Sequence, residues 1–459
     1  MHAKRISRLG TATLILSLIT QAAHAQTSDA GVPTPAAAAA PAPGPLVPEG
    51  SVQPSAVALP AGPALPAAPT PESKPAEEKK EKDLPWYERL KIRGYTQFRY
   101  NRLPSAVKND KLVNDQGDRS LGRGNGFTIR RARVILYGDV HHYVSVYLQT
   151  DFASVIDTQL NVAIVRDWYT DISLDYDKTF RFRVGQSKVP FGFENLQSSQ
   201  NRLPLDRNDA LNSAVKDERD IGVYLMWAPK EIRARFKHLV DSGLKGSGDY
   251  GVVAFGAFNG QTANRLALED NMHGVLRVTW PFLFGKQFFE VGGGGYYGQY
   301  RISTSNANGI TYEKPDGNNL RDGRGFATVV LYPQPFGFVV EGNYGVGPAQ
   351  GNKGAADRYS IEERKAYGGY AQAMYKIDNV WKTEAIIPYV RATYYRGGKK
   401  FETNAPNYLV MEIEAGIEWQ ILKALEVVLA YDIADRTSSR APYNREKGHI
   451  TRVQLQVNY

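Results

Sequence analysis

Cysteine is absent from this chain of 459 residues, which excludes a disulfide scaffold, a thiolate metal site and a cysteine nucleophile. The sequence also lacks any run of ~20 apolar residues, the length that a membrane-spanning helix needs. Neither sign of charge dominates: 56 basic residues stand against 47 acidic ones, and the excess of +9 suits nucleic acid, an anionic surface or small anions alike. Aromatic residues reach 11%, with 27 tyrosines, and favour a β-rich protein.

The first 25 residues have the features of a secretory signal peptide. Three basic residues lie among the first eight, an apolar stretch follows at 9–19, and Ala23-His24-Ala25 is a small-residue cleavage site. The apolar stretch is too short for a spanning helix, and a buried helix is the alternative that fits less well. We therefore expect a mature chain that begins at Gln26 and works outside the cytoplasm.

Residues 26–85 have the composition of a linker. They hold 14 of the 26 prolines and 14 alanines, and residues 36–40 are a pure alanine run. Such a segment cannot bury a core, so we expect it to be disordered with polyproline II character. Residues 86–459 carry 49 basic and 40 acidic residues, which places the whole positive excess in this part of the chain.

From Trp86 onward, apolar and polar residues alternate. In the last segment Val453 and Leu455 lie on one face of an expected strand, while Arg452 and Gln454 lie on the other. A soluble β-sandwich also alternates, but here the pattern continues for about 370 residues without a second linker. A barrel that is apolar toward lipid and polar toward a water-filled lumen explains this. The sequence therefore predicts an all-β fold, a transmembrane antiparallel β-barrel over residues 86–459.

Sixteen strands are expected in this region. They are predicted to begin near Ile92, Phe127, Tyr143, Ala163, Thr179, Asp220, Asp249, His273, Gln287, Gly325, Phe336, Ala366, Ala385, Leu409, Ala424 and Gly448. A seventeenth candidate at 232–240 is rejected, because Ile232, Phe236 and Leu239 follow helical spacing and a short helix fits better. Bacterial single-chain barrels also have even strand numbers.

The connections between the expected strands alternate between short and long. Tight turns are expected at 138–142, 175–178, 332–335 and 422–424, and long loops at 102–125, 189–218, 301–323, 347–365, 398–408 and 434–447. Outer-membrane barrels have short periplasmic turns and longer extracellular loops. We therefore expect the bacterial outer membrane as the location, with both termini in the periplasm.

Several segments resemble the phosphate-selective porin O and P family. They are 94–99 (GYTQFR), 129–133 (IRRAR), 166–169 (RDWY), 184–194 (VGQSKVPFGFE), 219–223 (RDIGV) and 258–260 (FNG). The resemblance covers about residues 91–459 and is most specific at 184–194. It implies a homotrimeric outer-membrane porin of 16 strands, with the loop after the fifth strand, 189–218, folded into the pore. The terminal Tyr459 is similar to the C-terminal aromatic residue that the barrel insertion machinery reads.

Charged residues on the polar faces are the candidate lining of the pore. The basic candidates are Arg93, Arg99, Arg131, Arg133, Arg181, Arg183, Arg277, Arg391 and Arg452, and the acidic ones are Asp167, Asp171, Glu412, Glu414 and Glu418. Since the last strand pairs with the first in a closed barrel, several arginines are expected to form one basic wall, and arginine suits oxyanions. An acidic wall could face it, or the two sets could form ion pairs across the lumen.

The loop 189–218 is expected to form the constriction. Its candidate residues are Glu194, Arg202, Arg207 and Lys216. Residues 189–220 hold four basic and six acidic side chains, and from this balance we do not expect a strongly cationic constriction. The sequence therefore predicts a weak anion preference rather than tight phosphate binding.

Signals for catalysis are weak. His141-His142 lies in an expected turn without a third metal ligand nearby, and residues 293–298 match G-x-G-x-x-G although no helix follows. We therefore expect no enzyme activity, no metal and no cofactor.

The expected function is passive diffusion of small solutes with a preference for anions, phosphate or other oxyanions among them. The expected partners are these small anionic solutes, outer-membrane lipid, the insertion machinery and further copies of the chain, but no nucleic acid. Two alternatives stay open. One is an outer-membrane barrel that serves as the scaffold of an enzyme or adhesin, and the other is a secreted soluble β protein that binds polyanions.

Overall fold

The computed structural model describes residues 84–102, 126–156, 159–268, 270–306, 311–313, 319–353, 358–439 and 445–459. The expected signal peptide at 1–25 and all of the expected linker at 26–85 except Leu84 and Pro85 lie outside these ranges. Among the described residues, no helix has the length and apolar character needed to cross a membrane.

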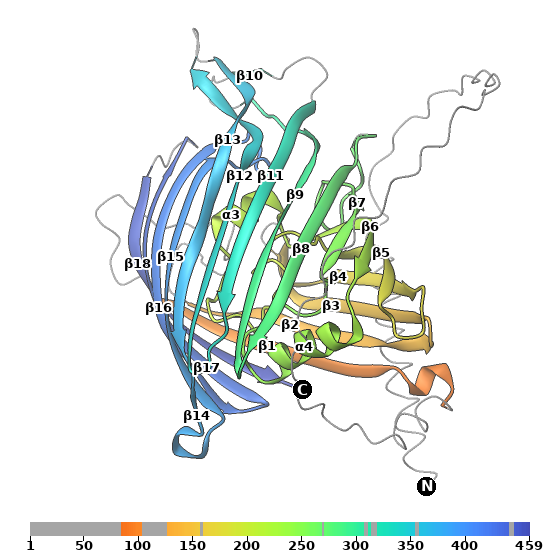
Figure 1. The fold of residues 1–459 in the computed structure, drawn as a ribbon. Helices are drawn as coiled ribbons and strands as arrows, with labels where there is room; N and C mark the ends of the chain where they lie inside the picture. Colours follow the sequence, from red (N-terminus) through yellow and green to blue (C-terminus); the bar gives the residue numbers. More distant parts are fainter. Residues whose placement is uncertain are drawn as a thin grey trace, which may run out of the picture. The chain divides into compact units, whose positions relative to one another are not determined.

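Within the described part of the chain, sixteen antiparallel strands form a closed barrel (Figure 1). They are β1 (Lys91–Arg102), β2 (Gly126–His141), β3 (Val144–Ile156), β4 (Gln159–Ser173), β5 (Phe180–Lys188), β6 (Arg219–Trp227), β7 (Val253–Phe258), β8 (His273–Phe284), β9 (Gln287–Arg301), β11 (Asn319–Leu331), β12 (Phe336–Lys353), β13 (Arg358–Tyr375), β15 (Ala385–Gly398), β16 (Asn407–Leu422), β17 (Leu425–Ser438) and β18 (Arg445–Asn458). Each strand pairs with the next, and β18 pairs with β1, which closes the sheet.

Smaller elements lie between and before these strands. β10 (Thr311–Glu313) pairs in parallel with β13, and β14 (Ile377–Asp378) pairs with β15. The described residues also form two single turns of 3-10 helix, η1 (Trp86–Glu88) and η3 (Val380–Lys382), and two α-helices, α3 (Asp209–Ala214) and α4 (Lys230–Asp241).

The alternating apolar and polar residues of the strands form the outer and inner faces of the barrel wall. In β18 the side chains of Arg452, Gln454 and Gln456 are buried inside, whereas Val453 and Leu455 are exposed on the outer surface. Successive side chains of a strand point to opposite faces, so an apolar outer face and a polar inner face arise together. The predicted fold class is confirmed.

The connections give the barrel two different ends. The tight turns expected at 138–142, 175–178, 332–335 and 422–424 are confirmed, and Tyr459 lies at the same end, called here the short-turn end. The strand starts agree with the expected ones to within four residues except for β11 and β13, which begin six and eight residues earlier.

The long loop expected at 347–365 is wrong. β12 runs to Lys353 and β13 starts at Arg358, so most of this segment is a strand hairpin. Residues 360–365 (SIEERK) are polar at nearly every position, so they show no alternation from which a strand could be predicted. A strand that rises beyond the hydrocarbon layer has water on its outer face and no longer needs to alternate.

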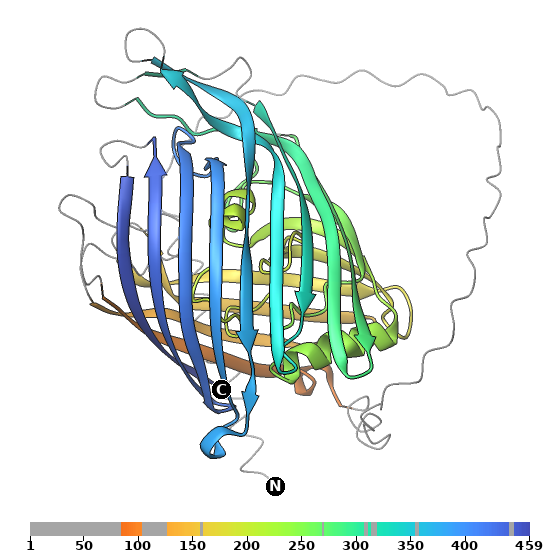
Figure 2. The same cartoon turned by 60° about the vertical axis from the view of Figure 1, so that its left-hand side comes forward.

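The rejected seventeenth strand is a helix, as expected. α4 connects β6 to β7 at the short-turn end (Figure 2), and Ile232, Phe236 and Leu239 are its buried residues. These side chains belong to an apolar cluster inside the barrel that also contains Phe288 and Tyr332 of the wall. The G-x-G-x-x-G segment lies within β9, so the sequence match has no phosphate-binding context there.

Gly94 lies in β1 at the seam, the place where β1 pairs with β18 and its C-terminal end and so closes the barrel. Its N–H donates to the Tyr459 carbonyl at 2.6 Å, and the Tyr459 N–H donates back at 2.9 Å. A Cβ at Gly94 would lie 2.4 Å from the Arg133 carbonyl oxygen and 2.5 Å from the Tyr459 ring. We therefore expect Gly94→Ala to lower the stability of the folded barrel by about 1–3 kcal/mol.

The measurement is the temperature at which the heat-modifiable folded band disappears on a gel. Gly126→Ala is the matched control, since Gly126 lies in the adjacent strand β2 with nothing within 4 Å of an added Cβ. If both variants lost the folded band at the same temperature, the contacts around Gly94 would not be as close as described.

Candidate functional site

Residues 189–218, called here the inserted loop, join β5 to β6 and fold into the barrel, where Figure 2 shows their helix α3 between the walls. Glu341 of β12 accepts hydrogen bonds from the backbone N–H groups of Phe193 at 2.8 Å and Glu194 at 3.0 Å. The Glu194 carboxylate accepts one from Arg391 of β15 at 2.6 Å. The loop is thus held inside the barrel by the wall, as the family resemblance implied.

The helix α3 within this loop is held by two residues that the sequence analysis did not single out. Arg324 of β11 donates to the Ala210 carbonyl at 3.1 Å and to the Ser213 hydroxyl at 2.8 Å. Lys399, just beyond β15, lies 2.8 Å from the Asp209 carboxylate. Both cations are buried, so they stabilise the loop instead of facing open water.

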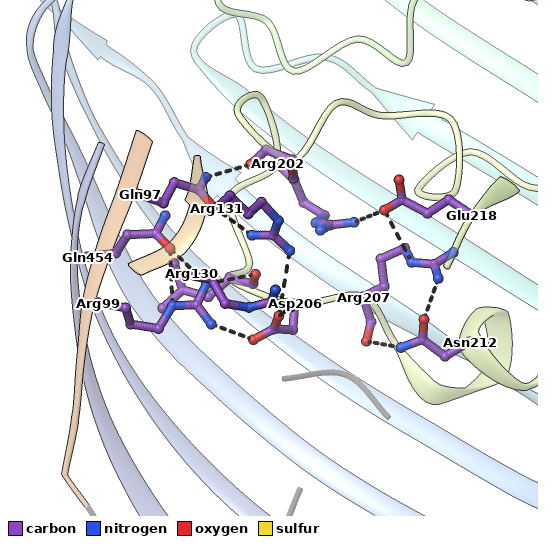
Figure 3. Close-up of polar contacts among 12 residues, drawn as sticks. Gln97, Arg99, Arg130, Arg131, Arg202, Asp206, Arg207, Asn212, Glu218 and Gln454 are labelled. Carbon is purple, nitrogen blue, oxygen red and sulfur yellow. Dashed lines mark hydrogen bonds and ion pairs between the residues drawn. The ribbon is translucent and has the colours of Figure 1, made fainter. Parts of the chain in front are cut away.

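The basic wall faces the inserted loop at Asp206 (Figure 3). The Asp206 carboxylate lies 2.9 Å from Arg99 of β1, 3.1 Å from Arg130 of β2 and 2.7 Å from Arg452 of β18. Arg131 of β2 is further away, at 3.9 Å. Strands from the two ends of the chain therefore meet one loop carboxylate, because β18 closes on β1.

Two β-bulges add arginines that strict alternation assigns to the lipid side. Gln97 pairs with Arg131 and Phe98 with Ile129, which leaves Arg130 without a cross-strand partner. In the same way Gln149 pairs with Asp167 and Thr150 with Val165, which leaves out Arg166. A bulge re-aims the extra side chain, and both arginines reach the interior.

The bulges and the inserted loop together surround a narrow cavity of about 50 Å³, called here the arginine cavity. It is lined by Arg130, Arg131, Arg133, Arg166, Arg202, Arg207 and Arg219, with Asn212, Asp217 and Glu218. Seven guanidinium groups thus face two carboxylates. Several of their donors, the Nε atoms of Arg131, Arg166 and Arg202 among them, are buried and have no acceptor among the described residues.

Glu218, the last residue of the inserted loop, is paired with cations at this cavity. Glu218 lies 2.6 Å from Arg219, 3.4 Å from Lys188 and Arg207, and 3.5 Å from Arg202. Burial would raise the pKa of Glu218, but these cations hold it well below its usual range.

Asp206 behaves in the same way. Burial opposes its ionisation, yet Arg99, Arg130 and Arg452 hold the pKa of its carboxyl well below the usual range. The Asp206 carboxylate therefore stays charged at neutral pH and remains part of the electrostatics of the wall.

The expectation of a constriction without strong positive charge came from residues 189–220 alone, where six acidic residues outnumber four basic ones, and it stays a prediction. In the folded barrel Asp206 and Glu194 bind arginines of the wall, and the wall adds the arginines of the two bulges. Lys216, the remaining loop candidate, is half-buried at the end of the loop.

The acidic candidates of the strands do not form a wall of their own. Each lies near a cation: Asp167 is 2.9 Å from Arg219, Asp171 2.7 Å from Arg183, Glu418 2.5 Å from Lys245 and Glu414 3.9 Å from Arg391, and Glu412 pairs closely with Arg436. Glu414 also accepts a hydrogen bond from the Tyr389 hydroxyl at 2.5 Å. Several of these pairs, such as Asp171 with Arg183 and Glu414 with Arg391, join neighbouring strands along the wall and do not cross the lumen.

The remaining basic candidates also lie inside the barrel. Arg181 is paired with Asp249 at 2.6 Å and Arg277 with Glu290 at 3.4 Å. Arg93 is half-buried and lines a second, larger cavity of about 760 Å³ toward the short-turn end, called here the vestibule. Arg219 lines both the vestibule and the arginine cavity, so the two spaces adjoin.

Comparison with known proteins gives one family and several similar folds. Residues 105–459 match the profile of the family described as phosphate-selective porin O and P. A search of curated proteins gives no significant match.

Among solved structures, the outer-membrane channel DcaP of Acinetobacter baumannii is 11% identical with a TM-score of 0.48, over 81% of this chain and 97% of that chain. OmpF of Salmonella typhi is 10% identical with a TM-score of 0.48, over 81% and 97%. An anion-selective porin from Comamonas acidovorans is 10% identical with a TM-score of 0.44, over 81% and 99%. Identity to these structures is low, so the family match decides the assignment.

The anchor at Glu341 can be tested by its effect on the loop. Glu341→Ala removes the acceptor of two backbone N–H groups, and a buried donor left without an acceptor costs about 1–3 kcal/mol. We expect the inserted loop to loosen and single-channel conductance to rise and become noisier.

Glu363→Ala is the control, because Glu363 lies on the neighbouring strand β13 and binds Arg321 at an exposed site. Its conductance should equal that of the wild type. Identical traces from all three proteins would mean that Glu341 does not hold the loop.

Proposed function

The chain belongs to the phosphate-selective porin O and P family and is an outer-membrane porin, and we propose that small anions are the solutes that its pore favours. The observation that supports this preference is the arginine cavity, which is lined by seven guanidinium groups and two carboxylates. Three further carboxylates, Asp151, Asp167 and Asp206, pair with these arginines from outside the lining, which leaves seven cations against five anions. Arginine does not lose its proton in proteins, so this excess is permanent. The forked donors of guanidinium groups suit oxyanions such as phosphate.

The preference should be weak at high ionic strength. The Debye length is ~8 Å at physiological salt and ~3 Å at 1 M, so the charge of the wall acts only on ions that pass close to it. In the arginine cavity every ion passes close, because the space holds about 50 Å³. Selectivity should therefore come from the constriction rather than from the wider vestibule.

The orientation and the partners follow from the two ends and the outer face. Short turns are typical of the periplasmic side, which would place Tyr459 and the start of β1 there. The apolar outer face suits outer-membrane lipid, and the amphipathic strand β18 with its terminal aromatic residue suits the insertion machinery. Membership in the family further implies assembly as a homotrimer.

Reversal potentials in planar bilayers under a salt gradient test the proposal. The wild type should prefer chloride over potassium at low salt. The double variant R166Q/R202Q removes two charges of the arginine cavity while keeping polar side chains, so its reversal potential should move toward cation preference. Conductance at 1 M salt should change little, since charge is screened there.

The matched control is R321Q/R358Q, which removes two exposed arginines that bind Glu363 and Glu313 outside the cavity. Its reversal potential should stay near that of the wild type. Equal shifts from both double variants, or a cation-preferring wild type, would contradict the proposal.

A further inference from the structure

The Asp206 carboxylate occupies the place that an anion would take on the basic wall. Three guanidinium groups from β1, β2 and β18 lie within 3.1 Å of it, and Arg131 lies at 3.9 Å. Figure 3 shows Arg99, Arg130 and Arg131 around this carboxylate. Such a convergence of forked donors is how proteins bind carboxylate and phosphate groups. Here the ligand is a side chain of the protein itself.

This cluster borders the arginine cavity directly. Arg130 and Arg131 contact Asp206 and also line the cavity. A second carboxylate, Asp432, lies 2.9 Å from Arg452. A change of charge at Asp206 therefore acts on the ions in the cavity through two arginines that face them.

We propose that Asp206 is a built-in counter-anion that sets how strongly the pore prefers anions. The inference rests on the proposed anion preference and deepens it. In this role the carboxylate masks part of the positive charge of the wall, which keeps a passing anion from being held. Removing its charge should therefore strengthen anion selectivity.

A purely structural role of Asp206 predicts something else. The inserted loop is also held by Glu341, by the Glu194–Arg391 pair and by Lys399, so the loss of one carboxylate charge leaves it in place. If Asp206 served only as an anchor, its variant would change conductance at every salt concentration. A counter-anion instead changes selectivity at low salt and leaves conductance at 1 M salt unchanged.

The experiment compares D206N with the wild type in planar bilayers under a potassium chloride gradient at low salt. Two unit charges ~7 Å apart in water interact by about RT, with opposite sign for an anion and a cation. The ratio of anion to cation permeability should therefore rise about sevenfold. D209N is the matched control, since Asp209 lies in the same loop but binds Lys399 away from the arginine cavity. It should give less than half of that shift.

The variant R130Q helps to distinguish an effect of charge on selectivity from a failure of D206N to fold. R130Q alone should shift selectivity toward cations, and D206N/R130Q, which restores the charge balance, should return it to the wild-type value. This pair measures the effect of Asp206 even if D206N alone fails to assemble. No shift or a shift toward cations on removing the Asp206 charge, or equal shifts in D206N and D209N, would overturn the inference.

The outcomes also separate this inference from the proposed function. A wild type that prefers cations would contradict the function, whereas the change between R130Q and D206N/R130Q would still report the role of Asp206. An anion-preferring wild type with no response at Asp206 would keep the function and remove the inference.

Discussion

Every guanidinium group inside this barrel has to be compensated, because a charge that is buried without a partner costs several kcal/mol. Pairing β18 with β1 turns the polar faces of all strands toward one enclosed space. The inserted loop fills part of that space and brings carboxylates to the wall, as Asp206 does for Arg99 and Arg452. The position of the loop and the charge of the pore therefore depend on the same ion pairs.

Among the described residues, the positive charge is not fully compensated around the arginine cavity. Most charged side chains within the described interior form close pairs, such as Arg183 with Asp171 and Lys245 with Glu418. Around the arginine cavity the bulges at Arg130 and Arg166 raise the number of cations to seven. Five carboxylates pair with them: Asp217 and Glu218 of the lining and the adjacent Asp151, Asp167 and Asp206. A local excess of this kind is what a channel needs in order to attract anions and release them again.

Alternation along the strands was sufficient to predict the barrel, and the helical spacing of Ile232, Phe236 and Leu239 was sufficient to predict the helix α4. Alternation assigns Arg130 and Arg166 to the wrong face. Each lies at a β-bulge, and a bulge turns one residue to the other face without changing the pattern of the sequence. A signal was present in both cases. Arg130-Arg131 and Arg166-Asp167 are consecutive charged residues, and an arginine on the lipid face costs about 2–4 kcal/mol near the membrane centre. The partners of Asp206 and Lys399 are far apart in the chain, so only the folded loop reveals them.

Diffraction from crystals soaked in sodium bromide tests the central claim, that anions occupy the arginine cavity, most directly. Bromide scatters anomalously and is a small anion without a preferred protein geometry, so its peaks mark where the field of the protein collects anions. We expect an anomalous peak between Arg131, Arg166 and Arg202, where buried donors have no acceptor among the described residues. Peaks only at exposed arginines such as Arg321 and Arg358, with an empty arginine cavity, would contradict the account.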